Sequence, residues 1–214
     1  MTSAAPDHAP KYAQLSLPDR IGKAMPLLLV PLLVVFGFLS IGSTSSWLTL
    51  TVSGLAMGMM IFIMASGLTL VFGLMDVINF GHGAFISVGA YVGISALLAL
   101  ESWTGVPSLL LNVAAVLAAV IAAMCVTGAL GWGFERVIVR PVYGAHLKQI
   151  LVTVGGLIVI EQMIHVLWGP DEIYLTRPET LKGAVTFAGA AIEKYRLLAV
   201  VFGLALFVAM RLVL

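Results

Sequence analysis

Long apolar runs dominate this chain and constrain its fold more than any other feature. A bilayer core about 30 Å thick is crossed by about 20 helical residues, each rising 1.5 Å. Charges, prolines or glycine clusters bound six runs of about this length, which are residues 24–42, 47–72, 83–100, 109–133, 148–168 and 196–214. Apolar residues make up 61% of the chain and charged residues only 10%, an apolar share above that of a soluble domain. The sequence therefore predicts an all-α polytopic membrane protein with about six transmembrane helices.

Basic residues in the short loops predict the orientation of these helices. One basic cluster lies in the polar N-terminal tail, residues 1–23, and the other follows the fourth span; they are Lys11, Arg20 and Lys23, and Arg136, Arg140 and Lys148. Because basic loops stay in the cytoplasm, the tail and the second cluster are both expected there. Residues 101–108 and 169–195 then lie outside, and the Thr, Pro and Gly content of the longer segment predicts a partly structured external loop. The last run ends without a polar flank, so we expect the transmembrane domain, residues 24–214, to be incomplete.

Several classes of function are excluded by what the sequence lacks. Its formal net charge is +1, and it has no basic patch of the kind that binds nucleic acid. Cys125 is the single cysteine, so disulfides and cysteine metal sites within the chain are excluded. The chain has no phosphate-binding G-x-x-x-x-G-K-[ST] loop, no H-E-x-x-H metal site and no G-x-S-x-G nucleophile elbow. We expect no catalytic residue, metal or cofactor in this chain, and energy from a partner or an ion gradient.

One apolar stretch, LVFGLMDVINFGHGAF at residues 70–85, carries three polar side chains three residues apart: Asp76, Asn79 and His82. An Asp facing lipid at mid-bilayer costs roughly 2.5–3.5 kcal/mol on insertion scales, which excludes that placement. The sequence therefore predicts a broken or turn segment near residues 73–83.

Three interpretations of this segment remain open. In the first, Asp76 or Asn79 caps the third helix and His82 packs or meets water. In the second, a discontinuous helix lines an aqueous path for a polar substrate, as in many transporters, so that Asp76, Asn79 and His82 are candidate path residues. In the third, the segment contacts a partner subunit. The glycines at positions 73, 81 and 83 permit a break in the helix in any of these cases.

Other small and charged residues have assignable roles. Gly54 and Gly58, and Gly89 and Gly93, stand four apart, a spacing at which membrane helices pack closely. Glu161 and His165 are expected to pair with each other or with water. A charged cluster follows the fourth span and consists of Glu135, Arg136 and Arg140. This cluster either sets the topology, with Glu135 neutralising one arginine, or contacts a partner subunit.

Two long blocks carry a family resemblance. The first is GLTLVFGLMDVINFGHGAFISVGAYV, residues 67–92, and the second is FERVIVRPVYGAHLKQILVTVGGLIVIEQMIHVLWGPDE, residues 134–172. Together they resemble the LivH-type permease subunits of branched-chain amino-acid ABC importers. The resemblance covers the chain from about residue 45 onward. In that family a cytoplasmic loop that docks on the ATPase and about two more helices follow the last span present here.

The resemblance implies a permease of the bacterial inner membrane with several partners. These are a LivM-type permease, two cytoplasmic ATPases that bind ATP and Mg, and a periplasmic binding protein that delivers the substrate. Relatives that import urea or short amides are not separated from it by these motifs. From another class, an ion-coupled carrier or passive channel remains an alternative, and an intramembrane enzyme has only scattered Ser and His residues in its favour.

Overall fold

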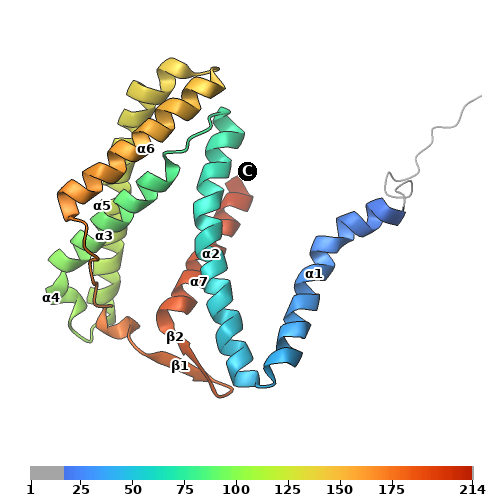
Figure 1. Cartoon of the computed structure of the whole chain (residues 1–214). Helices are drawn as coiled ribbons and strands as arrows, with labels where there is room; N and C mark the ends of the chain where they lie inside the picture. Colours follow the sequence, from blue (N-terminus) through green and yellow to red (C-terminus); the bar gives the residue numbers. More distant parts are fainter. Residues whose placement is uncertain (1–16, 214) are drawn as a thin grey trace, which may run out of the picture.

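The computed structural model describes the backbone of residues 17–213 (Figure 1). Its elements in chain order are α1 (Leu17–Ile41), α2 (Thr44–Met75), α3 (His82–Ala99), α4 (Glu101–Thr104), α5 (Leu109–Phe134), the π-helical turn η2 (Glu135–Val139), the 3-10 turn η3 (Arg140–Val142), α6 (His146–Trp168), the 3-10 turn η4 (Glu179–Leu181), β1 (Ala184–Phe187), β2 (Ala190–Glu193) and α7 (Lys194–Val213). The basic residues of the predicted cytoplasmic tail, Lys11, Arg20 and Lys23, lie outside the residues whose side chains are described.

Five helices of the described chain are long and apolar enough to cross a membrane, and they confirm the helical membrane class. They are Thr44–Met75, His82–Ala99, Leu109–Val142, His146–Trp168 and Lys194–Leu212. The first predicted span corresponds to α1, whose described apolar part, Leu28–Ile41, is shorter than a crossing requires. Most large apolar side chains on these helices are exposed, as at Leu110 and Leu151. Such surfaces suit contact with lipid or with further membrane helices, because both are as apolar as the side chains.

The helices form two groups (Figure 1). In the first group, α3 packs against α5 and α6, and in the second, α7 lies along α2. Although α2 and α3 are consecutive, they contact each other little, and α1 contacts only α2 to any extent. The chain crosses between the two groups twice, through residues 76–81 between α2 and α3 and through residues 169–193 between α6 and α7.

Glycines allow close approach of the helices at positions that differ from most of those predicted. A Cβ atom at Gly203 of α7 would lie 2.6 Å from Met59 Cβ of α2, and one at Gly89 would lie 3.3 Å from Thr127 Cγ2 of α5. At Gly54, Gly58 and Gly93 a Cβ would meet nothing within 4 Å. Within the described chain, only Gly89 of the four predicted packing glycines meets a neighbouring helix.

A β-hairpin occupies part of the segment predicted as a loop over residues 169–195, and adds strands to a fold predicted as all helical. Strands β1 and β2 pair antiparallel, with Ala184 opposite Glu193 and Phe187 opposite Ala190. The two turn residues, Ala188 and Gly189, both have positive φ, which matches the right-handed twist of a tight hairpin. Helix α7 starts at Lys194, directly after β2, two residues before the predicted start of the last span.

The side chain of Asn112 binds residues 169–193 to the helices through hydrogen bonds. Its side chain is buried, and its Nδ2 donates to the carbonyls of Trp103 at 2.8 Å and Val106 at 2.9 Å. Its Oδ1 accepts hydrogen bonds from both the backbone N–H and the hydroxyl of Thr180, each at 2.9 Å. The amide thus ties η4 to α4 and to the turn that precedes α5, because its four hydrogen bonds are made to those three segments.

Candidate functional site: the break between α2 and α3

The predicted break between the second and third spans is present. Helix α2 ends at Met75, and Asp76 adopts the left-handed conformation with φ 52° and ψ 36°, its N–H bonding to the Phe72 carbonyl. Residues 76–81 are not helical, and α3 starts at His82. Asp is among the few non-glycine residues that tolerate this backbone conformation. The predicted break glycines Gly73 and Gly83 lie inside helices, where a Cβ would meet nothing within 4 Å.

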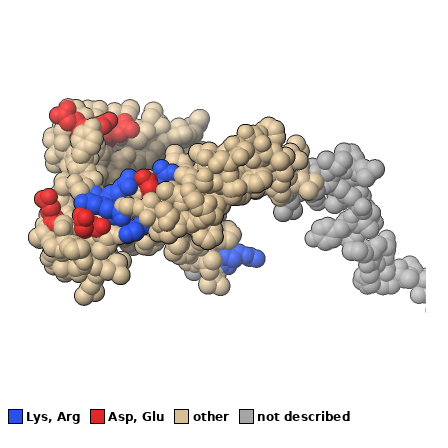
Figure 2. All heavy atoms as spheres, turned by 90° about the horizontal axis from the view of Figure 1, so that it is seen from below, with Lys and Arg blue, Asp and Glu red and all other residues tan. Residues whose placement is uncertain are grey.

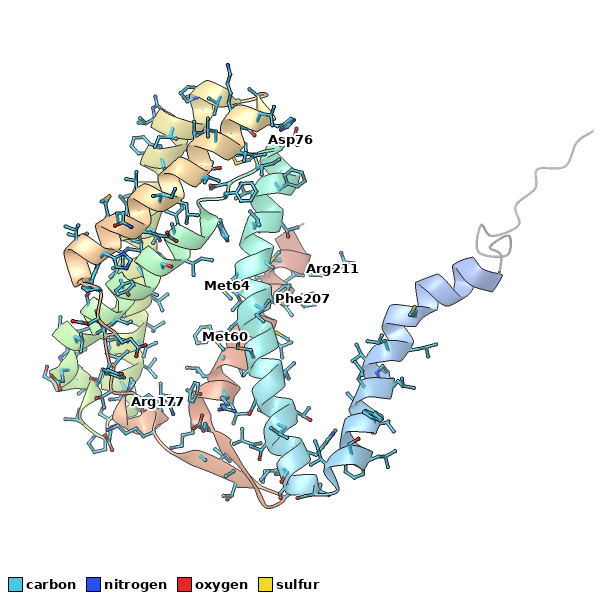
Figure 3. All side chains as sticks on the ribbon, viewed as in Figure 1. Met60, Met64, Asp76, Arg177, Phe207 and Arg211 are labelled. Atoms are coloured by element: carbon cyan, nitrogen blue, oxygen red, sulfur yellow. The ribbon has the colours of Figure 1, made fainter. Side chains whose placement is uncertain are left out.

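The capping interpretation needs correction at Asp76. This residue ends α2 and does not begin α3, and its side chain is exposed at the end of α2 (Figure 3). Helix α3 is preceded by Gly81, and it has no side-chain cap. Asn79 instead folds onto its own turn, where its Oδ1 accepts a hydrogen bond from the Gly81 N–H at 3.0 Å. The break prevents Asp76, Asn79 and His82 from forming the single polar stripe of a continuous helix.

His82 connects the two helix groups. Its Nε2 lies 3.0 Å from the Met64 carbonyl oxygen of α2. This contact depends on Gly67, because a Cβ there would lie 2.8 Å from His82 Cε1. The imidazole therefore reaches the backbone of a helix that α3 otherwise barely touches.

Two polar residues of α6, Gln149 and Thr153, are buried beside the broken segment, and Thr153 bonds to it. The Thr153 hydroxyl accepts a hydrogen bond from the Phe80 N–H at 3.2 Å and donates to the Gln149 carbonyl at 2.7 Å. Both α6 side chains are almost fully buried, and Gln149 Oε1 has no hydrogen-bond partner among the described residues. Gln149 and Thr153 were not predicted as site residues, although two polar residues four apart in an apolar span are a usable signal.

A cavity of about 240 Å³ lies beside the break. Its polar lining comes from three parts of the chain and consists of Asn79, His82, Glu135 and Tyr143; most of the rest of the lining is apolar, and Asp76 does not contribute. The structure therefore brings Asn79 and His82 together with Glu135, a residue that the sequence assigned to a different role. Tyr143 was not predicted as a site residue.

Glu135 has a different partner from the one predicted. Its carboxylate accepts a hydrogen bond from the Tyr143 hydroxyl at 2.7 Å, and that bond is the main reason that the pKa of Tyr143 is raised. In the described chain Glu135 makes no ion pair with Arg136 or Arg140, both of which are exposed. Arg136 instead lies over the Trp132 ring, 5.8 Å from its centroid. The described chain therefore shows no direct pairing of Glu135 with either arginine, and the two roles predicted for the charged cluster stay predictions.

Of the two alternatives predicted for Glu161 and His165, a side-chain contact between them is absent from the described chain, and contact with water stays a prediction. His165 Nδ1 bonds to the backbone carbonyl of Glu161 at 2.8 Å. The imidazole therefore binds its own helix and not the carboxylate, and both residues are exposed.

A larger cavity of about 610 Å³ lies between α3, α5 and α6, and its lining is almost wholly apolar. Phe85 and Phe134 line this cavity and the polar one alike, with their rings edge to face at a centroid distance of 5.3 Å. A Cβ at Gly156 would lie 2.3 Å from Phe134 Cε2. The Phe134 ring, which borders both cavities, can therefore take this position only because Gly156 has no side chain.

The fold and this site together define a multi-pass helical membrane protein of the transporter type, in which polar groups gather at a broken membrane helix. The chain belongs to the family described as "Branched-chain amino acid transport system / permease component", which matches residues 50–213. This family membership confirms the resemblance found in the sequence.

Curated relatives carry names of the same kind. The chain is 32% identical over 171 residues to the high-affinity branched-chain amino acid transport system permease protein BraD of Pseudomonas aeruginosa, covering 74% of this chain and 53% of BraD. It is 31% identical over 124 residues to LivH of Salmonella typhimurium and 30% identical over 124 residues to LivH of Escherichia coli K12, each match covering 58% of this chain and 39% of the relative. The chain thus spans about half the length, or less, of these relatives. No solved structure matches it.

Proposed function

We propose that this chain forms part of the membrane-spanning permease subunit of an ABC importer that moves branched-chain amino acids across the bacterial inner membrane. Its family membership and the names of its relatives support this function. The observation that carries the proposal is the convergence of Asn79, His82 and Glu135 on one cavity beside the broken helix. A zwitterionic substrate needs a few polar groups in an otherwise apolar path, and a broken membrane helix supplies them.

The proposed path opens alternately to the two sides of the membrane. At the end that carries the break, the α2–α7 and α3–α5–α6 groups are linked by residues 76–81 and by the contact between His82 and the Met64 carbonyl; at the other end, residues 169–193 join α6 to α7. These links suit a hinge, because the two groups share few other contacts. Nucleotide binding by partner subunits would favour one arrangement of the groups only through its different affinity for the two.

The proposed assembly contains a LivM-type permease, two cytoplasmic ATPases that bind ATP and Mg, and a periplasmic binding protein. Arg136 and Arg140 support a contact with a partner, because both are exposed and neither forms an ion pair in the described chain. Both arginines lie at the same end of the helices as the break (Figure 1), and we propose that this end faces the cytoplasm. The N-terminal tail is proposed to lie in the cytoplasm as well.

The experiment is uptake of labelled leucine by cells with and without the intact gene, with unlabelled isoleucine, valine and urea as competitors. Uptake should require the gene and ATP, survive collapse of the proton gradient, and be blocked by isoleucine and valine. Competition by urea but not by isoleucine or valine would show that the substrate is not a branched-chain amino acid. Uptake that persists without ATP would contradict the ABC assignment and favour a channel or a carrier.

A variant of the break tests the path residues. His82→Ala should lower uptake about tenfold, the effect of one lost hydrogen bond, with an unchanged amount of folded protein in the membrane. His165→Ala is the matched control, because that imidazole binds only its own helix. Asp76→Ala and Asn79→Ala extend the comparison across the segment. An equal loss of uptake and of folded protein would show that the segment is structural only.

A further inference from the structure

A second polar pocket lies at the end of the molecule far from the break, between α2, strand β2 and the start of α7. Figure 3 shows this separation, with Arg177 near the pocket and Asp76 at the opposite end. The pocket measures about 150 Å³, and its lining consists of Thr49, Ser53, Ala191, Ile192, Glu193 and Arg196. One water molecule needs a cavity volume of about 10–15 Å³. The pocket is therefore large enough for the polar end of a small molecule.

Arg196 is the central charge of this pocket. It is the third residue of α7, a position from which a long basic side chain can reach the polar membrane interface. Its Nε donates to Glu193 Oε2 at 3.0 Å, and its Nη1 donates to the Ser53 hydroxyl of α2. Its Nη2 has no partner among the hydrogen bonds of the described residues, and one third of the side chain is exposed. Part of the guanidinium therefore remains available to a carboxylate, which it can bind through two parallel hydrogen bonds.

Glu193 gives the pocket a negative group between two positive ones. Its carboxylate lies 3.0 Å from Arg196 Nε and 3.8 Å from Arg177 Nη1. A hydrogen bond from Tyr195 and the two neighbouring arginines lower the pKa of Glu193, so the carboxylate is charged at neutral pH. Figure 2 shows the wider setting, in which Lys and Arg side chains gather in the middle of this end with Asp and Glu side chains around them. The three charged residues together leave one net positive charge.

The hydroxyl groups of α2 act as acceptors in this pocket. The Thr49 hydroxyl donates to the Ser45 carbonyl at 3.0 Å, and the Ser53 hydroxyl donates to the Thr49 carbonyl at 2.6 Å. Because both protons are used within the helix, both oxygens can only accept hydrogen bonds; the Ser53 oxygen already accepts one from Arg196 Nη1 and has one lone pair left. The pocket thus offers acceptors for an ammonium group, free donors for a carboxylate, and an apolar wall at Ala191 and Ile192.

We propose that this pocket is a subsite that binds the ammonium and carboxylate groups of an amino acid at the hairpin end of the permease. Glu193 and the hydroxyl oxygens of Thr49 and Ser53 would accept from the ammonium, and Arg196 would donate to the carboxylate. The inference rests on the proposed function, because that function supplies an amino acid as the molecule that passes.

The test is protection of a cysteine in the pocket by amino acids, in the intact importer reconstituted in vesicles. Cys125 and every other native cysteine are first replaced by serine, and Thr49→Cys then provides one reactive thiol. Leucine should slow the reaction of this thiol with a polar thiosulfonate reagent. Leucinol, which lacks the carboxylate, should not slow it. Arg196→Gln should raise the leucine concentration for half protection by about 10- to 100-fold, as expected for loss of a charged hydrogen bond.

Ser46→Cys is the matched control, because this residue lies one turn earlier on α2 and lines a neighbouring hollow that Thr49 also borders but Glu193 and Arg196 do not. It should react at the same rate with and without leucine. Equal protection of both thiols would overturn the subsite, since it would show a general change of shape. Absence of protection while the Thr49→Cys importer still takes up leucine would overturn the subsite and leave the proposed function standing. Absence of leucine uptake by the unmodified importer would be the failure of the proposed function itself.

Discussion

Replacing Gly156 with alanine should destabilise the protein through one identifiable contact. The new Cβ would lie 2.3 Å from Phe134 Cε2 and 2.5 Å from Phe134 Cζ. Carbon atoms prefer a separation of about 3.5–4.0 Å, so the ring or α6 has to move by roughly 1.2 Å or more. Overpacking of this kind costs about 1–3 kcal/mol.

Gly155→Ala is the matched control for this prediction. It lies on the same helix, where a Cβ would meet nothing within 4 Å. Alanine gains up to about 1 kcal/mol in helix propensity at either position, so the propensity cancels when the two variants are compared. Gly156→Ala should therefore be less stable than Gly155→Ala by the steric cost alone, about 1–3 kcal/mol.

The assay is the free energy of unfolding of the purified protein in mixed micelles, measured by titration with a denaturing detergent. Adding Phe134→Leu to each alanine variant should remove most of the difference between them, because the double mutant isolates the pairwise contact. Equal stability of Gly156→Ala and Gly155→Ala would refute the reasoning. Uptake should also fall in Gly156→Ala, since Phe134 lines both cavities.

Three further predictions concern the break and the hairpin. Thr153→Val should cost about 1–3 kcal/mol, because the Phe80 N–H loses its acceptor, whereas Thr153→Ser should keep the hydrogen bond; equal unfolding free energies would contradict this. Asn112→Ala should speed protease cleavage between residues 169 and 193 by about 10- to 100-fold, because the hydrogen bonds from Thr180 to Asn112 are lost. Unchanged cleavage would show that these hydrogen bonds do not hold the segment. Because the pKa of Glu193 is lowered, its stabilising contribution is present above the usual value of about 4.3 and is lost as pH falls through the lower folded value. The hairpin should therefore resist protease at pH 5 in the parent protein and be cleaved faster at that pH in Glu193→Gln; a parent hairpin that opens at pH 5 would contradict the lowered pKa.

The break could be predicted closely from the sequence, but its contacts could not. Polar residues inside an apolar run locate an interruption, because an uncompensated charge cannot face lipid. Which residue adopts the left-handed conformation, however, depends on how the chain leaves α2. Asp76 takes that conformation, while Gly73 and Gly83 stay in their helices.

Small-residue spacing was a poor guide to helix contacts for a related reason. A glycine pair four residues apart marks one face of a helix, but spacing does not say whether that face meets lipid or another helix. Gly54 and Gly58 face open space in the described chain, while Gly67, Gly156 and Gly203 accommodate His82, Phe134 and Met59. Close helix contacts at glycine are therefore located by the neighbouring side chain that fills the space, and not by the spacing of the glycines.

The sequence by itself determined the membrane class, five of the six predicted spans, the position of the break and the family resemblance. These features depend on the length of apolar runs, on polar interruptions and on local motifs, all of which are properties of neighbouring residues. Only the tertiary structure decided that Asn79, His82 and Glu135 share one cavity, and that Arg196 meets Ser53 across 143 positions of chain. Such contacts depend on which helices pair and on their rotation about their axes, and the apolar pattern leaves both open because nearly every face of these helices is apolar.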